Sequence, residues 1–269
     1  MKTHTIIIIT ALLIGSLSAS AQSTTQQDEL QYAEYLVNNG KSSLAYQTLN
    51  SLIQNSPSCH YAYYLRALNY YNDRNAKSAI YDINQAIKRK PLDGSYLTLK
   101  GDILTLMGKH GQAAECYSTA ARAQDAPTQY TYSAALAYLR DQNYTKAADY
   151  ATRLLEAAPE CDSAKLLAAE IHIADNNTTD ALRIINTVAT HDARFHRLRG
   201  IAYCKSQMND LALGDLNAAI DIDPSLHDIY IWRGLAKYQS GDRKGAHNDW
   251  NTAISLRQYS AKDLLQKYR

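Results

Sequence analysis

The stretch IYIWRGLAKYQSGD, residues 229–242, predicts an amphipathic helix followed by the turn that ends it. Its apolar residues recur at helical spacing, and Gly241 suits a helix end because glycine adopts left-handed backbone angles without steric cost. Arg233 stands among these apolar residues, where an unpaired guanidinium would be costly. The arginine therefore requires either a partner within the fold or a ligand.

Small residues recur along the chain with a period of 34 residues. The clearest series is Ala45, Ala79, Ala113, Ala147, Ala181, Ala212 and Ala246, in which the step from Ala181 to Ala212 alone is 31 residues. Small side chains are needed where two helices cross closely, and prolines in the same register stop a helix because proline cannot continue it. The period predicts helical hairpins that stack to bury one continuous core.

This pattern resembles the tetratricopeptide repeat family, whose repeats carry an aromatic residue at one position in each helix. Tyr70, Tyr138 and Tyr203 match the aromatic of the first helix, and Tyr117 and Trp250 match that of the second. The resemblance implies an all-α, right-handed superhelical solenoid over residues 22–260 and a capping helix over 261–269. The seven repeats it implies are 26–59, 60–93, 94–127, 128–161, 162–192, 193–226 and 227–260.

The fifth repeat, 162–192, departs from the pattern because it lacks both the aromatic and the proline and is three residues short. The deletion lies between Ala181 and Gly200. We therefore expect an altered turn after the segment RIINTVAT and a kink of the solenoid at this repeat.

Arginine and aspartate occur together at two positions of the repeat. Position 7 is arginine and position 23 is aspartate in the second, sixth and seventh repeats, and neither residue occurs there in the other four. The two positions lie at similar heights on the antiparallel helices of one hairpin. We predict structural ion pairs within each repeat, the alternative being three arginines presented to an acidic ligand. The predicted pairs are Arg66 with Asp82, Arg199 with Asp215, and Arg233 with Asp249.

The first 21 residues have the three parts of a secretory signal peptide. An apolar run covers residues 6–15, and small residues precede a predicted cleavage point between Ala21 and Gln22. The run is short for a bilayer span, so an uncleaved anchor is the weaker alternative. We expect an exported protein, periplasmic, associated with the cell envelope or secreted, without membrane insertion after cleavage.

The sequence shows no constellation that indicates catalysis, a metal or a cofactor. It contains no Walker loop, dinucleotide-binding glycine motif or C-x-x-C pair, and its histidines are scattered. The formal charge of +2 gives no electrostatic reason to expect nucleic acid as a partner. The four cysteines lie on different repeats, too far apart for disulfides, so free and mostly buried thiols are predicted for Cys59, Cys116, Cys161 and Cys204.

In the family, the first helices of the repeats line a peptide-binding groove. The corresponding positions give Tyr61, Tyr64, Leu68 and Tyr71 in the second repeat, Tyr132, Leu136, Leu139 and Arg140 in the fourth, Arg197 and Lys205 in the sixth, and Ile231, Leu235 and Tyr238 in the seventh. The family's carboxylate clamp does not occur as a set, and the groove is mainly aromatic and aliphatic. The alternative is that several of these side chains pack between neighbouring repeats.

The leading functional hypothesis is a non-catalytic scaffold of the cell envelope that binds a segment of another protein. One alternative is a subunit of an envelope assembly or secretion complex. The other is an envelope receptor or enzyme with its site near the irregular fifth repeat.

Overall fold

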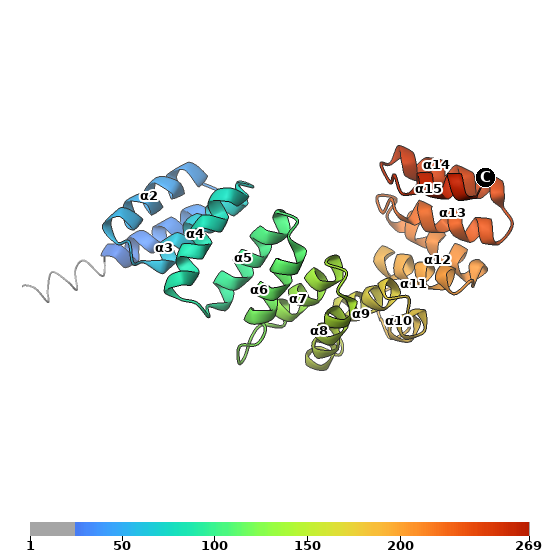
Figure 1. The fold of residues 1–269 in the computed structure, drawn as a ribbon, viewed down its shortest axis with the longest axis horizontal. Helices are drawn as coiled ribbons and strands as arrows, with labels where there is room; N and C mark the ends of the chain where they lie inside the picture. Colours follow the sequence, from blue (N-terminus) through green and yellow to red (C-terminus); the bar gives the residue numbers. More distant parts are fainter. Residues whose placement is uncertain (1–24, 269) are drawn as a thin grey trace, which may run out of the picture. The chain divides into compact units, whose positions relative to one another are not determined.

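The computed structural model describes residues 25–268, which form helices joined by short turns and contain no strand (Figure 1). The predicted all-α fold is therefore confirmed. The predicted signal peptide, residues 1–21, and its cleavage point lie outside the described residues. Within 25–268, no helix combines the length and the hydrophobicity that a membrane span requires.

The helices form consecutive antiparallel hairpins. The first helices of the hairpins are residues 25–38, α3 (His60–Asn72), α5 (Gly94–Leu106), α7 (Thr128–Arg140), α9 (Asp162–Ala174), α11 (Ala193–Lys205) and α13 (Ile229–Gln239). The second helices are α2 (Ser42–Asn55), α4 (Ala76–Arg89), α6 (His110–Ala120), α8 (Tyr144–Ala157), α10 (Thr178–Ile185), α12 (Asn209–Ile222) and α14 (Arg243–Ser255), and α15 (Ala261–Lys267) follows. The chain divides into two compact units, one ending at Ala126 and the other beginning at Pro127.

In the turn inside every hairpin, the residue at repeat position 15 has a left-handed backbone conformation, with a positive φ angle. Glycine occupies this position in three repeats, at Gly40, Gly108 and Gly241, with φ between 66° and 91°. The other four repeats use Arg74, Gln142, Asn176 and Gln207, with φ between 58° and 61°. A side chain in this conformation costs about 1–2 kcal/mol, so packing of the two helices determines these four turns.

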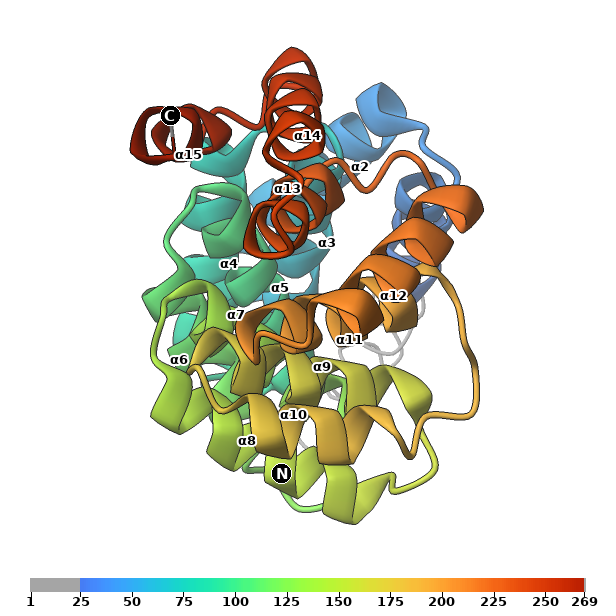
Figure 2. The ribbon, with the colours of Figure 1, turned by 90° about the vertical axis from the view of Figure 1, so that its right-hand side faces the viewer.

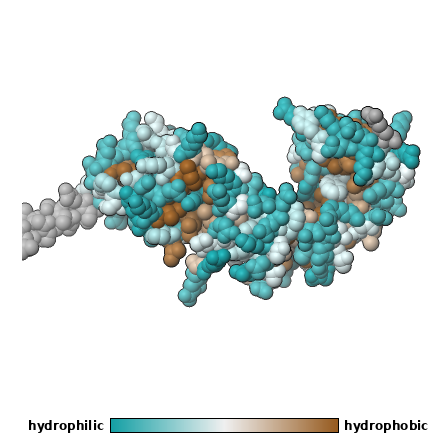
Figure 3. Space-filling view, in the orientation of Figure 1, coloured by the Kyte–Doolittle hydropathy of each residue, from teal (hydrophilic) through white to brown (hydrophobic). Residues whose placement is uncertain are grey.

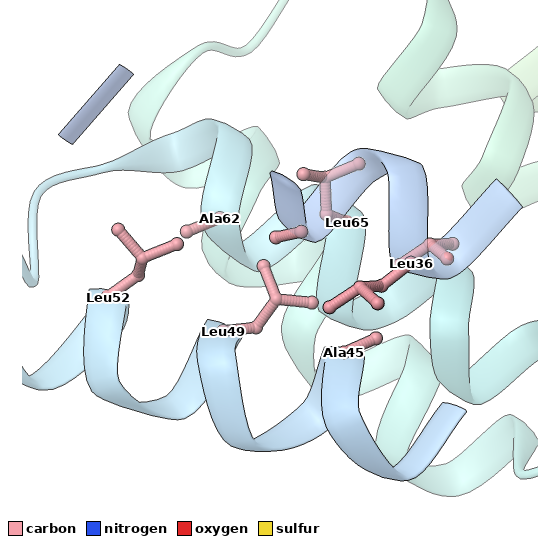
Figure 4. Close-up of a cluster of buried hydrophobic side chains, with 8 residues drawn as sticks. Leu36, Ala45, Leu49, Leu52, Ala62 and Leu65 are labelled. Carbon is pink, nitrogen blue, oxygen red and sulfur yellow. The ribbon is translucent and has the colours of Figure 1, made fainter. Parts of the chain in front are cut away.

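The core of each hairpin is formed by the small residues of the periodic series and the large side chains opposite them. Figure 4 shows Leu36, Leu49 and Leu65 converging from three consecutive helices beside Ala45, each of them at most 3% exposed. Glycine occupies the crossing position in three repeats, at Gly101, Gly200 and Gly234, and a Cβ atom at any of them would come within 3 Å of the opposing side chain. A Cβ atom at Gly234, for example, would lie 2.5 Å from Nε1 of the indole of α14.

The C-terminal end of the second unit is covered by α15, which packs beside α14 (Figure 2). The ring of Tyr268 stacks on Trp250 with centroids 5.8 Å apart, and its backbone oxygen lies 3.0 Å from Nε2 of His247. Trp250 is fully buried as a result. The helix closes the apolar end of the stack, the role expected of a capping helix.

The fifth repeat differs in its second helix. The helix α10 has only 8 residues and ends at Ile185, so the deletion shortens the helix itself as well as altering the turn. Two side chains of α9 hold the following segment. Lys165, 8% exposed, donates to the carbonyl of Thr187 at 3.1 Å, and the carboxylate of Asp162 accepts from the backbone N–H of Thr190 at 2.8 Å. These bonds satisfy backbone groups that a longer helix would have paired.

Candidate functional site

The candidate site in each unit is the face formed by the first helices. Apart from consecutive helices, the close contacts among the labelled helices are α3 with α5, α7 with α9, α9 with α11, and α11 with α13, all pairs of first helices. First helices therefore approach one another more closely than second helices do. We call this side of each unit the first-helix face, and the predicted groove residues belong to it.

Tyrosines line the first-helix face of the first unit. Tyr61, Tyr64, Leu68 and Tyr71 are all partly buried, and they pack against the buried clusters between neighbouring hairpins. The ring of Tyr64 stacks on Tyr61 at 5.6 Å and on Tyr96 at 4.8 Å. These residues thus combine a role in packing with a partly exposed aromatic surface.

Two acidic residues accompany these tyrosines. The pKa of Tyr61 is raised to about 12, mainly by burial and secondly by the hydrogen bond with Glu34. Asp102 on α5 accepts a hydrogen bond of 2.6 Å from the hydroxyl of Tyr117. Burial raises the pKa of Asp102 above its ordinary value, although this hydrogen bond lowers it. Glu34 and Asp102 are not among the predicted groove residues, although both occupy position 9 of their repeats, as Leu68 does.

The first-helix face of the second unit carries a chain of charged groups. Arg197 binds the carboxylate of Asp228, with its Nε 2.9 Å from Oδ1, and its Nη1 lies 4.0 Å from Glu170. Arg194 donates from Nη2 to the same glutamate at 2.9 Å. Burial lowers the pKa of Arg197, but the hydrogen bond and charge of Asp228, together with the charge of Glu170, raise it above its ordinary value. Three neighbouring repeats are therefore linked by alternating charges.

Of these charged residues, only Arg197 was predicted. Arg194 and Asp228 occupy position 2 of their repeats and Glu170 position 9, so the family register contained the signal for all three. Their pairing could not be read from the register alone, since each bond joins different repeats. Because both arginines already have carboxylate partners, an incoming acidic group has to compete with Glu170 and Asp228 for them.

The other predicted groove residues of the second unit divide into two kinds. Tyr132, Leu136, Leu139, Ile231 and Leu235 are partly buried, and Arg140 is exposed. Two others are used inside the protein. Lys205 donates to the carbonyl of Ile173 at 2.9 Å and to Oδ1 of Asn176 at 2.7 Å, and the ring of Tyr238 lies 4.4 Å from that of Tyr268 on the capping helix.

Comparisons with known proteins agree with this architecture. A family model described as the N-terminal TPR repeats region of Psidin matches residues 35–165, and a tetratricopeptide repeat model matches residues 138–201. The chain therefore contains tetratricopeptide repeats within residues 35–201. A tetratricopeptide repeat protein from Parabacteroides merdae superimposes with a TM-score of 0.71 at 18% identity, over 90% of this chain and 98% of that one.

Two further relatives extend the comparison. The structure of PilW, described as a type IV pilus biogenesis factor, has a TM-score of 0.61 at 15% identity, covering 74% of this chain and 94% of that chain. The human mitochondrial import receptor subunit TOM70 is 30% identical over 144 residues. That match covers 51% of this chain and 24% of the receptor, so the chain spans about a quarter of this curated relative's length.

The arginines at position 7 of the tetratricopeptide repeats bind the aspartates at position 23. In the seventh repeat, Nε and Nη2 of Arg233 lie 2.9 and 2.7 Å from the carboxylate oxygens of Asp249. The same two-bond geometry joins Arg66 to Asp82 and Arg199 to Asp215. All three aspartates are buried. The three arginines are therefore already engaged in holding the two helices of their hairpins together, and they are not free to bind a ligand.

Two of these arginines also contact the preceding repeat. Nη1 of Arg233 donates to Oδ1 of Asn217 at 2.9 Å, and Arg66 donates to Asn50 in the same way. Both asparagines occupy position 25 of the repeat before. The ion pair within one tetratricopeptide repeat thus also joins two repeats, a link that the sequence analysis did not predict.

The four cysteines are free, but the expectation that they are mostly buried is wrong. Only Cys204 is buried, and burial raises the pKa of its thiol to about 12. Cys116 lies within α6 and is partly buried. Cys59 and Cys161 directly precede α3 and α9, and they are partly buried and exposed, respectively. Among residues 25–268, no group of three or more His, Cys, Asp or Glu side chains is placed to hold a metal ion.

Proposed function

We propose that this chain is a non-catalytic scaffold of the cell envelope that binds a segment of another protein on the first-helix faces of its tetratricopeptide repeats. The observation that carries the proposal is the composition of these faces. They combine partly exposed tyrosine rings with arginines held in fixed positions by carboxylates. Tyrosine and arginine are the residue types that most often dominate binding energy in protein interfaces.

The two units offer different chemistry to a partner. The stacked Tyr61 and Tyr64 of the first unit suit aromatic or aliphatic side chains, since such rings contact them over their faces. The arginines of the second unit suit hydrogen-bond acceptors, and the neighbouring Glu170 and Asp228 limit binding to groups that can replace a carboxylate. The envelope location is supported by the signal-peptide pattern of residues 1–21.

Site-specific photo-crosslinking in intact cells tests the binding surface. We would replace Tyr61 and Tyr132 on the first-helix faces, one at a time, by p-benzoylphenylalanine and identify cross-linked proteins by mass spectrometry. Tyr259, which is 59% exposed and precedes the capping helix, is the matched control. We expect both first-helix positions to cross-link a protein that the control does not. Cross-links from the control alone would refute the proposed surface.

The location is tested separately. Cells are fractionated and the N-terminus of the purified protein is sequenced, with the expected result that the mature chain starts at Gln22 and leaves the cytoplasm. A chain that starts at Met1 in the cytosolic fraction would contradict the envelope role and leave the binding surface in place. Stable co-purification in one large complex would favour the assembly-subunit alternative.

A further inference from the structure

A pocket of about 320 Å³ opens between the second helices α2 and α4 of the first unit. It is lined by Tyr46 of α2, by Tyr70 of α3, and by Lys77, Ser78 and Tyr81 of α4. Arg66 of α3 and Asp82 of α4 line it as well. Because α2 and α4 both pack on α3, that helix forms the floor of the pocket.

The pocket is separate from the first-helix face. Successive residues of an α-helix are rotated by about 100°. On this basis Arg66 and Tyr70 project from α3 on the side opposite to Tyr61, Tyr64 and Leu68. The first unit therefore carries two surfaces on opposite sides of one helix.

The polar groups of the floor are already paired. The guanidinium of Arg66 lies 2.7 and 2.8 Å from the oxygens of Asp82 and also binds Asn50. The rings of Tyr46 and Tyr70 meet edge to face at 5.7 Å, and hydrogen bonds with Asn50 and Tyr70 lower the pKa of Tyr46. The surface that the floor presents to the pocket is therefore mainly that of aromatic rings.

The side chains that α2 and α4 contribute to the pocket include exposed ones. Tyr46 is 40% exposed and Tyr81 is 63% exposed. Lys77 is exposed too, and it makes no ion pair with any of the residues 25–268. Since Asp82 neutralises Arg66, the ammonium of Lys77 leaves the lining of the pocket with one net positive charge.

The seventh repeat provides an internal comparison. There Arg233, Asp249 and Asn217 repeat the contacts of Arg66, Asp82 and Asn50 between the corresponding helices α12, α13 and α14. The three tyrosine positions are occupied instead by Leu213, Lys237 and Asn248. The structural contacts therefore do not require tyrosines, and the aromatic wall of the first unit calls for another explanation.

We propose that this pocket binds one aromatic or aliphatic side chain of an acidic peptide segment, as a second docking site distinct from the first-helix face. The anchor side chain stacks between Tyr46 and Tyr81, and a carboxylate beside it in the segment pairs with Lys77. The volume lies at the low end for small-molecule sites, which suits a single side chain. The exposed tyrosines match the composition of binding hot spots, in which tyrosine is enriched.

Selection of peptides from a random displayed library on the full mature chain tests the proposal. We expect enriched peptides in which an aromatic or aliphatic residue has acidic neighbours. Binding of one fluorescein-labelled enriched peptide is then measured by fluorescence anisotropy. Tyr81→Ala and Lys77→Glu are each expected to weaken it about tenfold or more. The matched changes in the seventh repeat, Asn248→Ala and Lys244→Glu, are expected to leave it unchanged.

Charge exchange makes the test specific. Lys77→Glu should bind a version of the same peptide in which lysine replaces its acidic residues, which the unmodified chain should not. Circular dichroism of every variant checks that the helices are retained, and the side chains substituted in the pocket and in the seventh repeat are exposed. Enriched peptides that bind Tyr81→Ala unchanged but lose binding to Tyr61→Ala would place recognition on the first-helix face and overturn the proposal.

Two further outcomes would also overturn it. The absence of any enriched peptide that depends on Tyr81 would show that the pocket takes no peptide anchor. Binding of an oligosaccharide on a glycan array, lost in Tyr81→Ala, would assign the pocket to carbohydrate instead.

Discussion

The ion pair of the seventh repeat predicts a strong energetic coupling between its two residues. Each hydrogen bond to a charged group contributes about 1.5 kcal/mol, and Arg233 makes two of them to Asp249. The arginine is 18% exposed, so solvent reduces this sum, and Lys237 stays 2.9 Å from the aspartate after the arginine is removed. We therefore expect Arg233→Ala to lower the free energy of unfolding by about 2 kcal/mol.

Removing the aspartate should lower the free energy of unfolding more than removing the arginine. Asp249→Ala leaves the charges of both Arg233 and Lys237 without their carboxylate, so we expect a loss of about 3 kcal/mol. The double variant should lose about the same as Asp249→Ala alone, because the arginine then has nothing left to pair with. The coupling energy in the double-mutant cycle is thus about 2 kcal/mol.

Tryptophan fluorescence during urea denaturation measures these effects locally. The chain contains two tryptophans, Trp232 and Trp250, both in the seventh repeat. For a typical urea dependence, 2 kcal/mol corresponds to a midpoint shift of about 1 M. Lys244→Ala, at an exposed position of the same helix, is the control and should change stability by less than about 0.5 kcal/mol. Losses that add within about 0.5 kcal/mol would refute the pairing.

Three other outcomes are expected. In urea denaturation, Gly241→Ala lowers stability by about 1 kcal/mol, because the φ angle of Gly241 is 91°. Gly214→Ala raises stability by about 0.5 kcal/mol, because Gly214 lies within a helix and has open space around it. Iodoacetamide labels exposed Cys161 in the native protein and spares buried Cys204 until unfolding, as mass spectrometry would show. Because the pKa of Asp102 is raised in the folded state, the protein loses stability as the pH rises through that pKa. In thermal melts, Asp102→Asn should flatten this dependence of stability on pH, and an unchanged dependence would contradict the assignment.

The hairpins could be predicted from the sequence because small residues at a fixed period have one structural explanation, the close crossing of paired helices. The proximity of Arg233 to Asp249 also followed from the register, since positions 7 and 23 lie across one hairpin. The link to Asn217 could not be predicted in the same way, because it joins position 25 of one repeat to position 7 of the next and the pattern within a single repeat does not pair these positions.

The groove residues were harder to predict because their environment depends on elements outside their own repeat. Tyr238 occupies a repeat position that lines the groove in the family, but the ring of Tyr268, at the end of the capping helix, lies against its ring. Lys205 resembles a free cation in the sequence, yet the backbone of the preceding repeat accepts its hydrogen bond. Neither contact has a signal in the pattern of a single repeat.

The turn residues also have a consequence for the order in which the chain folds. Hairpins with glycine at position 15 can form their turn locally, because the unfolded backbone already visits that conformation. The first hairpin, which contains Gly40, is one of them, and it leaves the ribosome before the second. The second, which contains Arg74, gains its turn only when its helices pack. We expect the first hairpin to act as the template onto which the second condenses during synthesis.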